Sequence, residues 1–190
     1  QPAELEACRV EHGMDPLQVF ENAGLLHERF CAVHLTHPAP GDIGRLRRAG
    51  ASIAVCPTTE LDLGDGFLPV DARRANLCVG SDSHAAIDPW LEIRSLELHA
   101  RALAGQRNVM APVDDRHGLA RRLLDIGSRG GARALGIDGG RIAPGAPASL
   151  VALDLDRPAA VGVPPLEAAA LVATPAWVSH SWSLGRPLVV

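Results

Sequence analysis

Polar and titratable side chains follow three apolar stretches of the chain, and such side chains could bind a metal ion or transfer protons. The groups are His34, Thr36 and His37 after the first stretch, Cys56-Pro57-Thr58-Thr59-Glu60 after the second, and Ser81-Asp82-Ser83-His84 after the third. In parallel α/β proteins, catalytic groups gather where the carboxyl ends of the strands meet. Polar ends on three successive strands therefore predict a reaction site at that edge.

Asp82 is the strongest single candidate in this pattern. A carboxylate at the end of an apolar strand is costly to bury unless a metal ion or a hydrogen-bond donor neutralises it. Asp82 could therefore be a metal ligand or a general base. Strand alternation places Asp82 on one face with Gly80 and Cys78, and His34 on one face with Ala32. Small residues beneath polar strand ends suit the crowded interior of a barrel.

A structural interpretation competes with the chemical one for each of these residues. His34 could be a core histidine bonded to a backbone carbonyl, and Asp82 could be an N-cap for a following turn. His37 is interpreted as a loop residue, Glu60 as a solvated residue of an acidic loop, and His84 is left open. The other histidines are interpreted as surface or packing residues: His12, His27, His99, His117 and His180.

The elements that must position these groups alternate between strand and helix patterns. Strands are predicted at 30–35, 52–56 and 77–81, and helices at 3–12, 16–24, 40–49, 88–104 and 118–135. Residues 58–66 are predicted to form a Gly- and Asp-rich loop, followed by a short helix around 69–75. The strands are continuously apolar, as a parallel sheet covered on both faces requires. The pattern predicts a parallel α/β fold with the compact repeat of α/β barrels.

The composition changes near residue 139, where a turn-rich stretch begins. A strand is predicted at 149–154, a helix near 166–172, and a hairpin-like β tail at 177–182 and 187–190. We therefore expect an α/β region over residues 1–138 and a β-rich region over residues 139–190.

Charge and cysteine usage exclude several classes of protein. The chain has 190 residues and a formal net charge of −4, which gives no field to attract nucleic acid or an anionic membrane. No apolar run approaches the roughly 18 to 20 residues needed to span a bilayer. The four cysteines form no CxxC pair and are expected to be free, mostly buried thiols of a cytoplasmic protein. The arginine pairs at 47–48, 73–74 and 121–122 are interpreted as solvated helix faces.

Three motifs resemble the amidohydrolase superfamily in order and spacing. They are Val33-His34-Leu35-Thr36-His37, the stretch CPTTELDLGDG at 56–66, and Gly80-Ser81-Asp82-Ser83-His84. More narrowly they resemble the formimidoylglutamate deiminases, since related deaminases usually carry an Asn-Pro-x-Ser-Asn loop at the second motif. Residues 131–136, 145–151 and 184–187 resemble the closing segment of the superfamily, with Ser149 where Asp is usual. The resemblance covers nearly the whole chain.

The resemblance implies a (β/α)₈ barrel, of which this chain would supply strands 6–8, followed by part of a small β-rich domain. It implies one Zn²⁺ ion, with Asp82 as its strand 8 ligand and a proton acceptor, and His34 beside the metal to polarise or orient the substrate. No residue here matches the His-x-His ligand pair of strand 1. The sequence Gln1-Pro2-Ala3-Glu4 resembles the continuation of the strand 5 His-x-x-Glu-Gln motif.

Two functional hypotheses follow from this resemblance. In the first, the chain is a fragment of a Zn-dependent formimidoylglutamate deiminase, which hydrolyses N-formimidoyl-L-glutamate to N-formyl-L-glutamate and ammonia in histidine degradation. Another deaminase or a chlorohydrolase-like enzyme is the neighbouring alternative, with a small-molecule substrate, and a homodimer is left open. In the second, the chain is an inactive truncated product that binds no stoichiometric Zn²⁺, because catalytic zinc sites need three protein ligands.

Overall fold

The structure, a computed structural model, describes residues 1–84, 86–115 and 118–188. Its centre is a parallel sheet of three short strands, β1 (Cys31–Val33), β2 (Ser52–Val55) and β3 (Asn76–Val79), in the order β1-β2-β3. Cys31 pairs with Ser52, and Ala54 pairs with Cys78. The predicted parallel α/β class is confirmed, although each strand is shorter than its apolar run.

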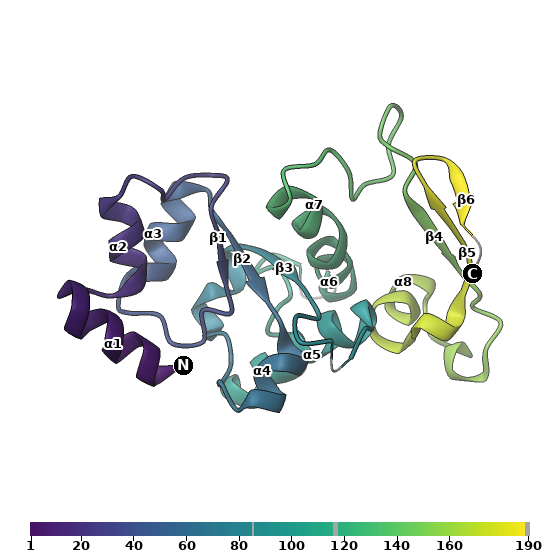
Figure 1. Ribbon diagram of the computed structural model, residues 1–190. Coiled ribbons are helices and arrows are strands. Elements are labelled where there is room, and N and C mark those ends of the chain that lie inside the picture. Colours follow the sequence, from purple (N-terminus) through teal and green to yellow (C-terminus); the bar gives the residue numbers. More distant parts are fainter. Residues whose placement is uncertain (85, 116–117, 189–190) are drawn as a thin grey trace.

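Helices connect and flank these strands. The pair α1 (Pro2–His12) and α2 (Pro16–Asn22) precedes β1, and α3 (Asp42–Ala49) joins β1 to β2. The connection from β2 to β3 contains α4 (Pro57–Leu63) and the 3₁₀ turn η1 (Val70–Arg74). Figure 1 shows α1, α2 and α3 grouped beside β1, with α6 and α7 on the β3 side of the sheet.

The helix α4 corrects the prediction of a loop at residues 58–66. Pro57 occupies the first turn, where its fixed φ suits a helix and its missing N–H costs nothing. Gly64 ends the helix in the left-handed conformation, with φ 70°. The glycines and Asp65 that suggested a loop therefore follow the helix and only terminate it.

Two longer helical segments cover the sheet. The first is α5 (Pro89–Ala104), whose N-cap Asp88 accepts hydrogen bonds from the amides of Trp90 and Leu91 at 2.9 and 3.0 Å. The second runs through α6 (Leu119–Asp125), the π turn η2 (Ile126–Gly130) and α7 (Gly131–Ala134). This second segment corresponds to the single helix predicted at 118–135.

The last part of the chain forms a separate antiparallel sheet, far from α1 in Figure 1. Its strands are β4 (Leu150–Leu153), β5 (Val178–Ser183) and β6 (Arg186–Leu188), in that order. Four short turns lie between β4 and β5: η3 (Pro158–Ala160), α8 (Pro165–Glu167), η4 (Ala168–Val172) and η5 (Pro175–Trp177). The predicted β tail is confirmed, while its last two residues, Val189 and Val190, and the interpreted His117 lie outside the described residues.

The hydrophobic core joins the parallel sheet to α5 and α6 and extends to residues of α2, α3 and η1. Ile53 and Leu77 on the strands, and Leu96 and Leu123 on the helices, are almost fully buried in it. All four cysteines are free thiols, as predicted. Cys56 and Cys78 are buried, whereas Cys31 is only partly buried because β1 is an outer strand of the three.

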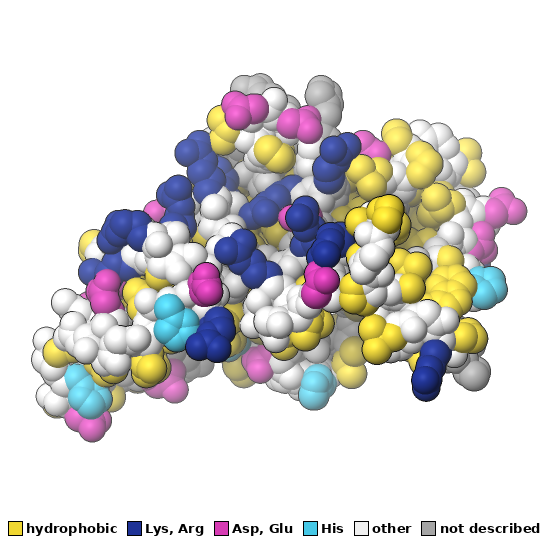
Figure 2. Space-filling view, turned by 90° about the horizontal axis from the view of Figure 1, so that it is seen from above, with side chains coloured by type: hydrophobic (Ala, Val, Ile, Leu, Met, Phe, Trp, Pro, Cys, Tyr) yellow, Lys and Arg dark blue, Asp and Glu magenta, His cyan; other side chains and the backbone are white. Residues whose placement is uncertain are grey.

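Arginine side chains gather on the face shown in Figure 2. Arg47 and Arg48 are exposed, as predicted for a solvated helix face. The same interpretation is wrong for Arg122, which is half-buried and donates hydrogen bonds to the carbonyl oxygens of Arg73 and Ala75 at 3.2 and 3.1 Å. No helix in the described part of the chain is long and apolar enough to cross a membrane.

The close packing of η2 on β3 gives a test of the fold. A Cβ at Gly130 would lie 2.1 Å from the carbonyl oxygen of Leu77, whereas a Cβ at the neighbouring Gly131 would meet nothing within 4 Å. We expect Gly130→Ala to lower the free energy of unfolding by about 3 kcal/mol, since backbone must move. Gly131→Ala should be neutral or stabilise by up to about 1 kcal/mol. Urea denaturation of both variants measures the difference, and equal stabilities would contradict this packing.

Candidate active site

The polar groups predicted from the sequence do lie at the carboxyl ends of the parallel strands, but in an unexpected backbone conformation. His34 and Asp82 have φ of 64° and 46°, in the left-handed region that residues other than glycine rarely adopt. Strand pairing ends at Val33 and Val79, so the face assignments made from strand alternation do not apply to His34 and Asp82. Strained residues of this kind cluster at functional sites.

The structure brings His34 and Asp82 together with a third residue, Cys56. One ligand atom from each of the three lies within 4.8 Å of the others, and His34 Nε2 is 3.7 Å from Asp82 Oδ2. The His34 side chain is 33% exposed and that of Asp82 45% exposed, so both can reach a small molecule. The N-cap of the following helix, α5, is Asp88 and not Asp82.

His34 is not a core histidine bonded to a carbonyl, because its partner is a buried carboxylate. Glu60 Oε1 lies 3.2 Å from His34 Nδ1 and accepts a hydrogen bond from the backbone amide of Cys56 at 2.8 Å. The other oxygen, Oε2, is buried and has no hydrogen-bond partner among the described residues. Burial raises the pKa of the Glu60 carboxyl.

Glu60 is the residue that the sequence interpretation placed wrongly. It was expected in a solvated loop, but its side chain is fully buried. The signal that could have found it was the pair Pro57 and Gly64, whose spacing marks a short helix. In such a helix Glu60 lies in the first turn, where an acidic side chain can reach back to the amides at the helix start.

The two residues before Glu60 attach α4 to its surroundings. The Thr59 hydroxyl lies 3.0 Å from the carbonyl oxygen of Ser81 and 2.9 Å from the hydroxyl of Ser83. The Thr58 hydroxyl and amide donate to the carboxylate of Glu92 on α5, at 2.6 and 3.1 Å. Thr58 therefore attaches α4 to α5, and Thr59 attaches it to the segment that carries Asp82. Glu60 makes the contact with His34.

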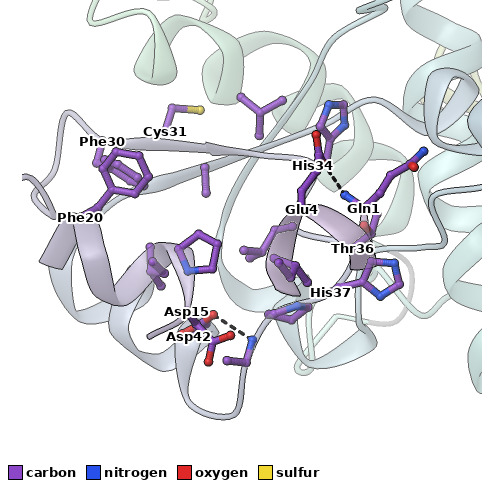
Figure 3. A pocket seen from close by; sticks show the side chains of 18 residues that line it. Gln1, Glu4, Asp15, Phe20, Phe30, Cys31, His34, Thr36, His37 and Asp42 are labelled. Atoms are coloured by element: carbon purple, nitrogen blue, oxygen red, sulfur yellow. Dashed lines mark hydrogen bonds and ion pairs between the residues drawn. The ribbon is translucent and has the colours of Figure 1, made fainter. Parts of the chain in front are cut away.

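A cavity of about 440 Å³ opens beside His34, between β1 and the helices α1 and α2 (Figure 3). Its described lining includes neither Cys56 nor Asp82, so it adjoins the site from the His34 side only. His37 lines this cavity from an exposed loop, as the loop interpretation expected. His84, which was left open, is exposed and has φ 58°.

The donor atoms suit a divalent metal of the zinc type. Imidazole nitrogen, thiolate sulfur and carboxylate oxygen are all zinc ligands. Burial, together with the charges of Glu60, Asp82 and Glu92, raises the pKa of the Cys56 thiol to about 12. Without a cation Cys56 is therefore a neutral thiol at neutral pH, and of these three donors only Asp82 and His34 have side chains that solvent reaches.

The reactivity of the cysteines in and beside the parallel sheet tests these pKa shifts. A hydrogen bond from the Cys78 thiol lowers the pKa of Cys31 to about 7, against the effect of partial burial. Because the thiolate reacts, iodoacetamide should modify Cys31 before Cys56 or Cys78, faster as the pH rises from about 6 to about 8. Peptide mass spectrometry after timed labelling measures this order, with Cys31→Ser as the control. Equal labelling of Cys56 and Cys31 would contradict it.

Comparison with known proteins places this geometry in context. A model of the amidohydrolase family matches residues 1–188. The chain is 37% identical to formimidoylglutamate deiminase of Pseudomonas aeruginosa over 162 residues, covering 83% of this chain and 35% of that protein. It is 33% identical to 5-methylthioadenosine/S-adenosylhomocysteine deaminase of Halobacterium salinarum over 161 residues, covering 82% of this chain and 36% of that protein.

A solved structure is similar over almost all of the chain. An adenosine deaminase from Xanthomonas campestris with bound zinc superposes with a TM-score of 0.89 at 29% identity, covering 99% of this chain and 43% of that one. The chain spans little more than a third of the length of the curated relatives described above. From the family match over nearly its full length, the chain belongs to the amidohydrolase family.

Proposed function

We propose that this chain carries part of the active site of a metal-dependent deaminase that hydrolyses the C–N bond of N-formimidoyl-L-glutamate. The observation that carries the proposal is the approach of His34 and Asp82 at the ends of two parallel strands, with Glu60 buried behind His34. Glu60 belongs to the Cys56-Pro57-Thr58-Thr59-Glu60 stretch that resembles the formimidoylglutamate branch. The identity to the Pseudomonas aeruginosa enzyme supports the same substrate.

We also propose an architecture for the chain. In this architecture β1, β2 and β3 correspond to strands 6–8 of a (β/α)₈ barrel, and the chain divides into one region of residues 1–138 and another of residues 139–190. Three parallel strands in sequential order support the first part, because neighbouring barrel strands follow one another along the chain. The separate antiparallel sheet β4–β6 supports the second.

Zn²⁺ is the metal we propose for this site, with Asp82 as a ligand and His34 and Cys56 as the neighbouring donors. When bound, Zn²⁺ supplies a nucleophile by lowering the pKa of a water molecule towards about 7. Asp82 would take the two protons of the attacking water in turn and pass them to the leaving nitrogen. The water oxygen would bond to the formimidoyl carbon and the carbon–nitrogen bond would break, which gives ammonia and the formyl product. His34, held from behind by Glu60, orients the reacting group.

The substrate assignment is tested by ammonia release. The gene product that carries residues 1–190 is expected to hydrolyse N-formimidoyl-L-glutamate with a higher kcat/KM than adenosine, 5-methylthioadenosine or S-adenosylhomocysteine. The adenosine-type substrates represent the second candidate, which the similarity to the Halobacterium salinarum enzyme favours. Release of ammonia only from the adenosine-type substrates would replace the first assignment by the second.

The role of Asp82 is tested by Asp82→Asn, which keeps the size of the side chain but removes its charge. Loss of proton transfer should lower ammonia release by about 10²–10⁴-fold. Asp71→Asn, at an exposed aspartate in η1, is the matched control and should leave the rate unchanged. Full activity of Asp82→Asn would contradict the role. The resemblance implies further zinc ligands that no residue of this chain matches. On that ground, the expectation that residues 1–190 alone bind no stoichiometric Zn²⁺ stays a prediction, although His34, Cys56 and Asp82 lie together. Metal analysis of the purified chain measures it.

A further inference from the structure

We propose that Glu60 is a positioning residue that holds His34 as the tautomer protonated at Nδ1, so that the unprotonated Nε2 faces Asp82. The inference takes one element from the proposed function, namely that His34 belongs to the reacting site. The tautomer itself is a property of the chain that can be measured without turnover.

The assignment of the proton follows from which Glu60 oxygen is used. Oε1 accepts the backbone N–H of Cys56 at 2.8 Å, and an amide can only donate. The same oxygen lies 3.2 Å from His34 Nδ1, while Oε2 has no partner among the described residues. Whether Glu60 is ionised or carries a proton on the unused Oε2, Oε1 remains an acceptor. In both of these states the hydrogen at this contact comes from the imidazole ring. Only a proton on Oε1 itself would reverse the bond, and a wild-type His34 protonated at Nε2 would reveal it.

The geometry at the other ring nitrogen follows. A neutral imidazole with its proton on Nδ1 presents a lone pair at Nε2, and an ionised carboxylate has only acceptor oxygens. Nε2 and Asp82 Oδ2 lie 3.7 Å apart, so two acceptors face each other across a short gap. In this tautomer, a cation or an N–H donor between the two acceptors relieves their repulsion. A metal ion and the N–H groups of an amidine both meet this need, and His34 then accepts rather than donates.

The surroundings of Glu60 suit a positioning role. Its helix α4 is attached through Thr58 to the buried Glu92 of α5, and through Thr59 to the segment that carries Asp82. The backbone of His34 is strained, with φ 64°, and its amide is held by the carbonyl of Ala54 at 2.8 Å. The ring is thus fixed at its backbone and at Nδ1, which leaves Nε2 as the free functional atom.

Nitrogen NMR of the chain with ¹⁵N-labelled histidine tests the proposal, because protonated and unprotonated ring nitrogens have well-separated shifts. At a pH where the ring is neutral, His34 is expected to show a protonated Nδ1 and an unprotonated Nε2. Loss of the signal in His34→Asn assigns it. The buried His99 is an internal control whose signal should not change in any Glu60 variant. A wild-type His34 protonated at Nε2 would overturn the proposal.

Two Glu60 variants distinguish the effect of the acceptor oxygen from the effect of side-chain volume. Glu60→Gln keeps an acceptor oxygen and should retain the Nδ1–H tautomer, whereas Glu60→Met fills similar space without an acceptor and should show a mixture of tautomers. An unchanged tautomer in Glu60→Met would also overturn the proposal. If Glu60→Met does not fold, the spectra of the wild type and of Glu60→Gln still test the proposal. Loss of the Nδ1–H tautomer in Glu60→Gln would contradict it.

Activity then distinguishes this inference from the proposed function. In the active protein, loss of the orienting contact in Glu60→Met should lower turnover by about 10–100-fold, with a smaller loss in Glu60→Gln. A changed tautomer with unchanged turnover would leave the role of Glu60 standing and would count against the proposed reaction at His34.

Discussion

The buried carboxylate of Glu60 is the constraint on which the site depends. Burying an ionisable group is unfavourable unless hydrogen bonds replace its hydration, and here only one of the two oxygens is bonded. An apolar residue of similar size would avoid this cost. The carboxylate therefore does more to fix the position of the His34 ring than to stabilise the fold. It joins the first turn of α4 to the imidazole of His34.

The same use of buried acids recurs along α5. Glu92 accepts the amide and hydroxyl of Thr58, and Glu97 accepts the amides of Val109 and Met110 at 3.2 and 2.8 Å. Each carboxylate accepts hydrogen bonds from backbone N–H groups of a segment that lies outside the β-sheets. In this way α5, which packs against the sheet through its apolar face, also fixes α4 and the 109–110 turn. The position of His34 is thus linked, through α4, to the core of the domain.

Local sequence patterns were sufficient to predict the framework but not the contacts at its edge. The apolar runs before His34 and Asp82 predict strands, and parallel strands bring their carboxyl ends together. The burial of Glu60 could not be read this way, because Gly64 and Asp65 made the surrounding stretch resemble a loop. The sequence places Cys56 at a strand end but does not show that its thiol lies beside His34 and Asp82. Alternation along a strand says nothing about the side chains of His34 and Asp82, because pairing has ended there and φ has become positive.

The chemistry available at this edge follows from an excess of acceptors. Glu60, Asp82 and Glu92 all raise the pKa of the Cys56 thiol, and none of the three forms an ion pair with an arginine in the described part of the chain. The arginines are instead gathered elsewhere, on surfaces such as the one that includes Arg122 and Arg129. A site with carboxylates, an imidazole lone pair and a thiol, but no fixed cation, has its lowest energy when a cation is bound. The proposed metal ion and the proposed amidine substrate, in its positively charged form, would both meet this requirement.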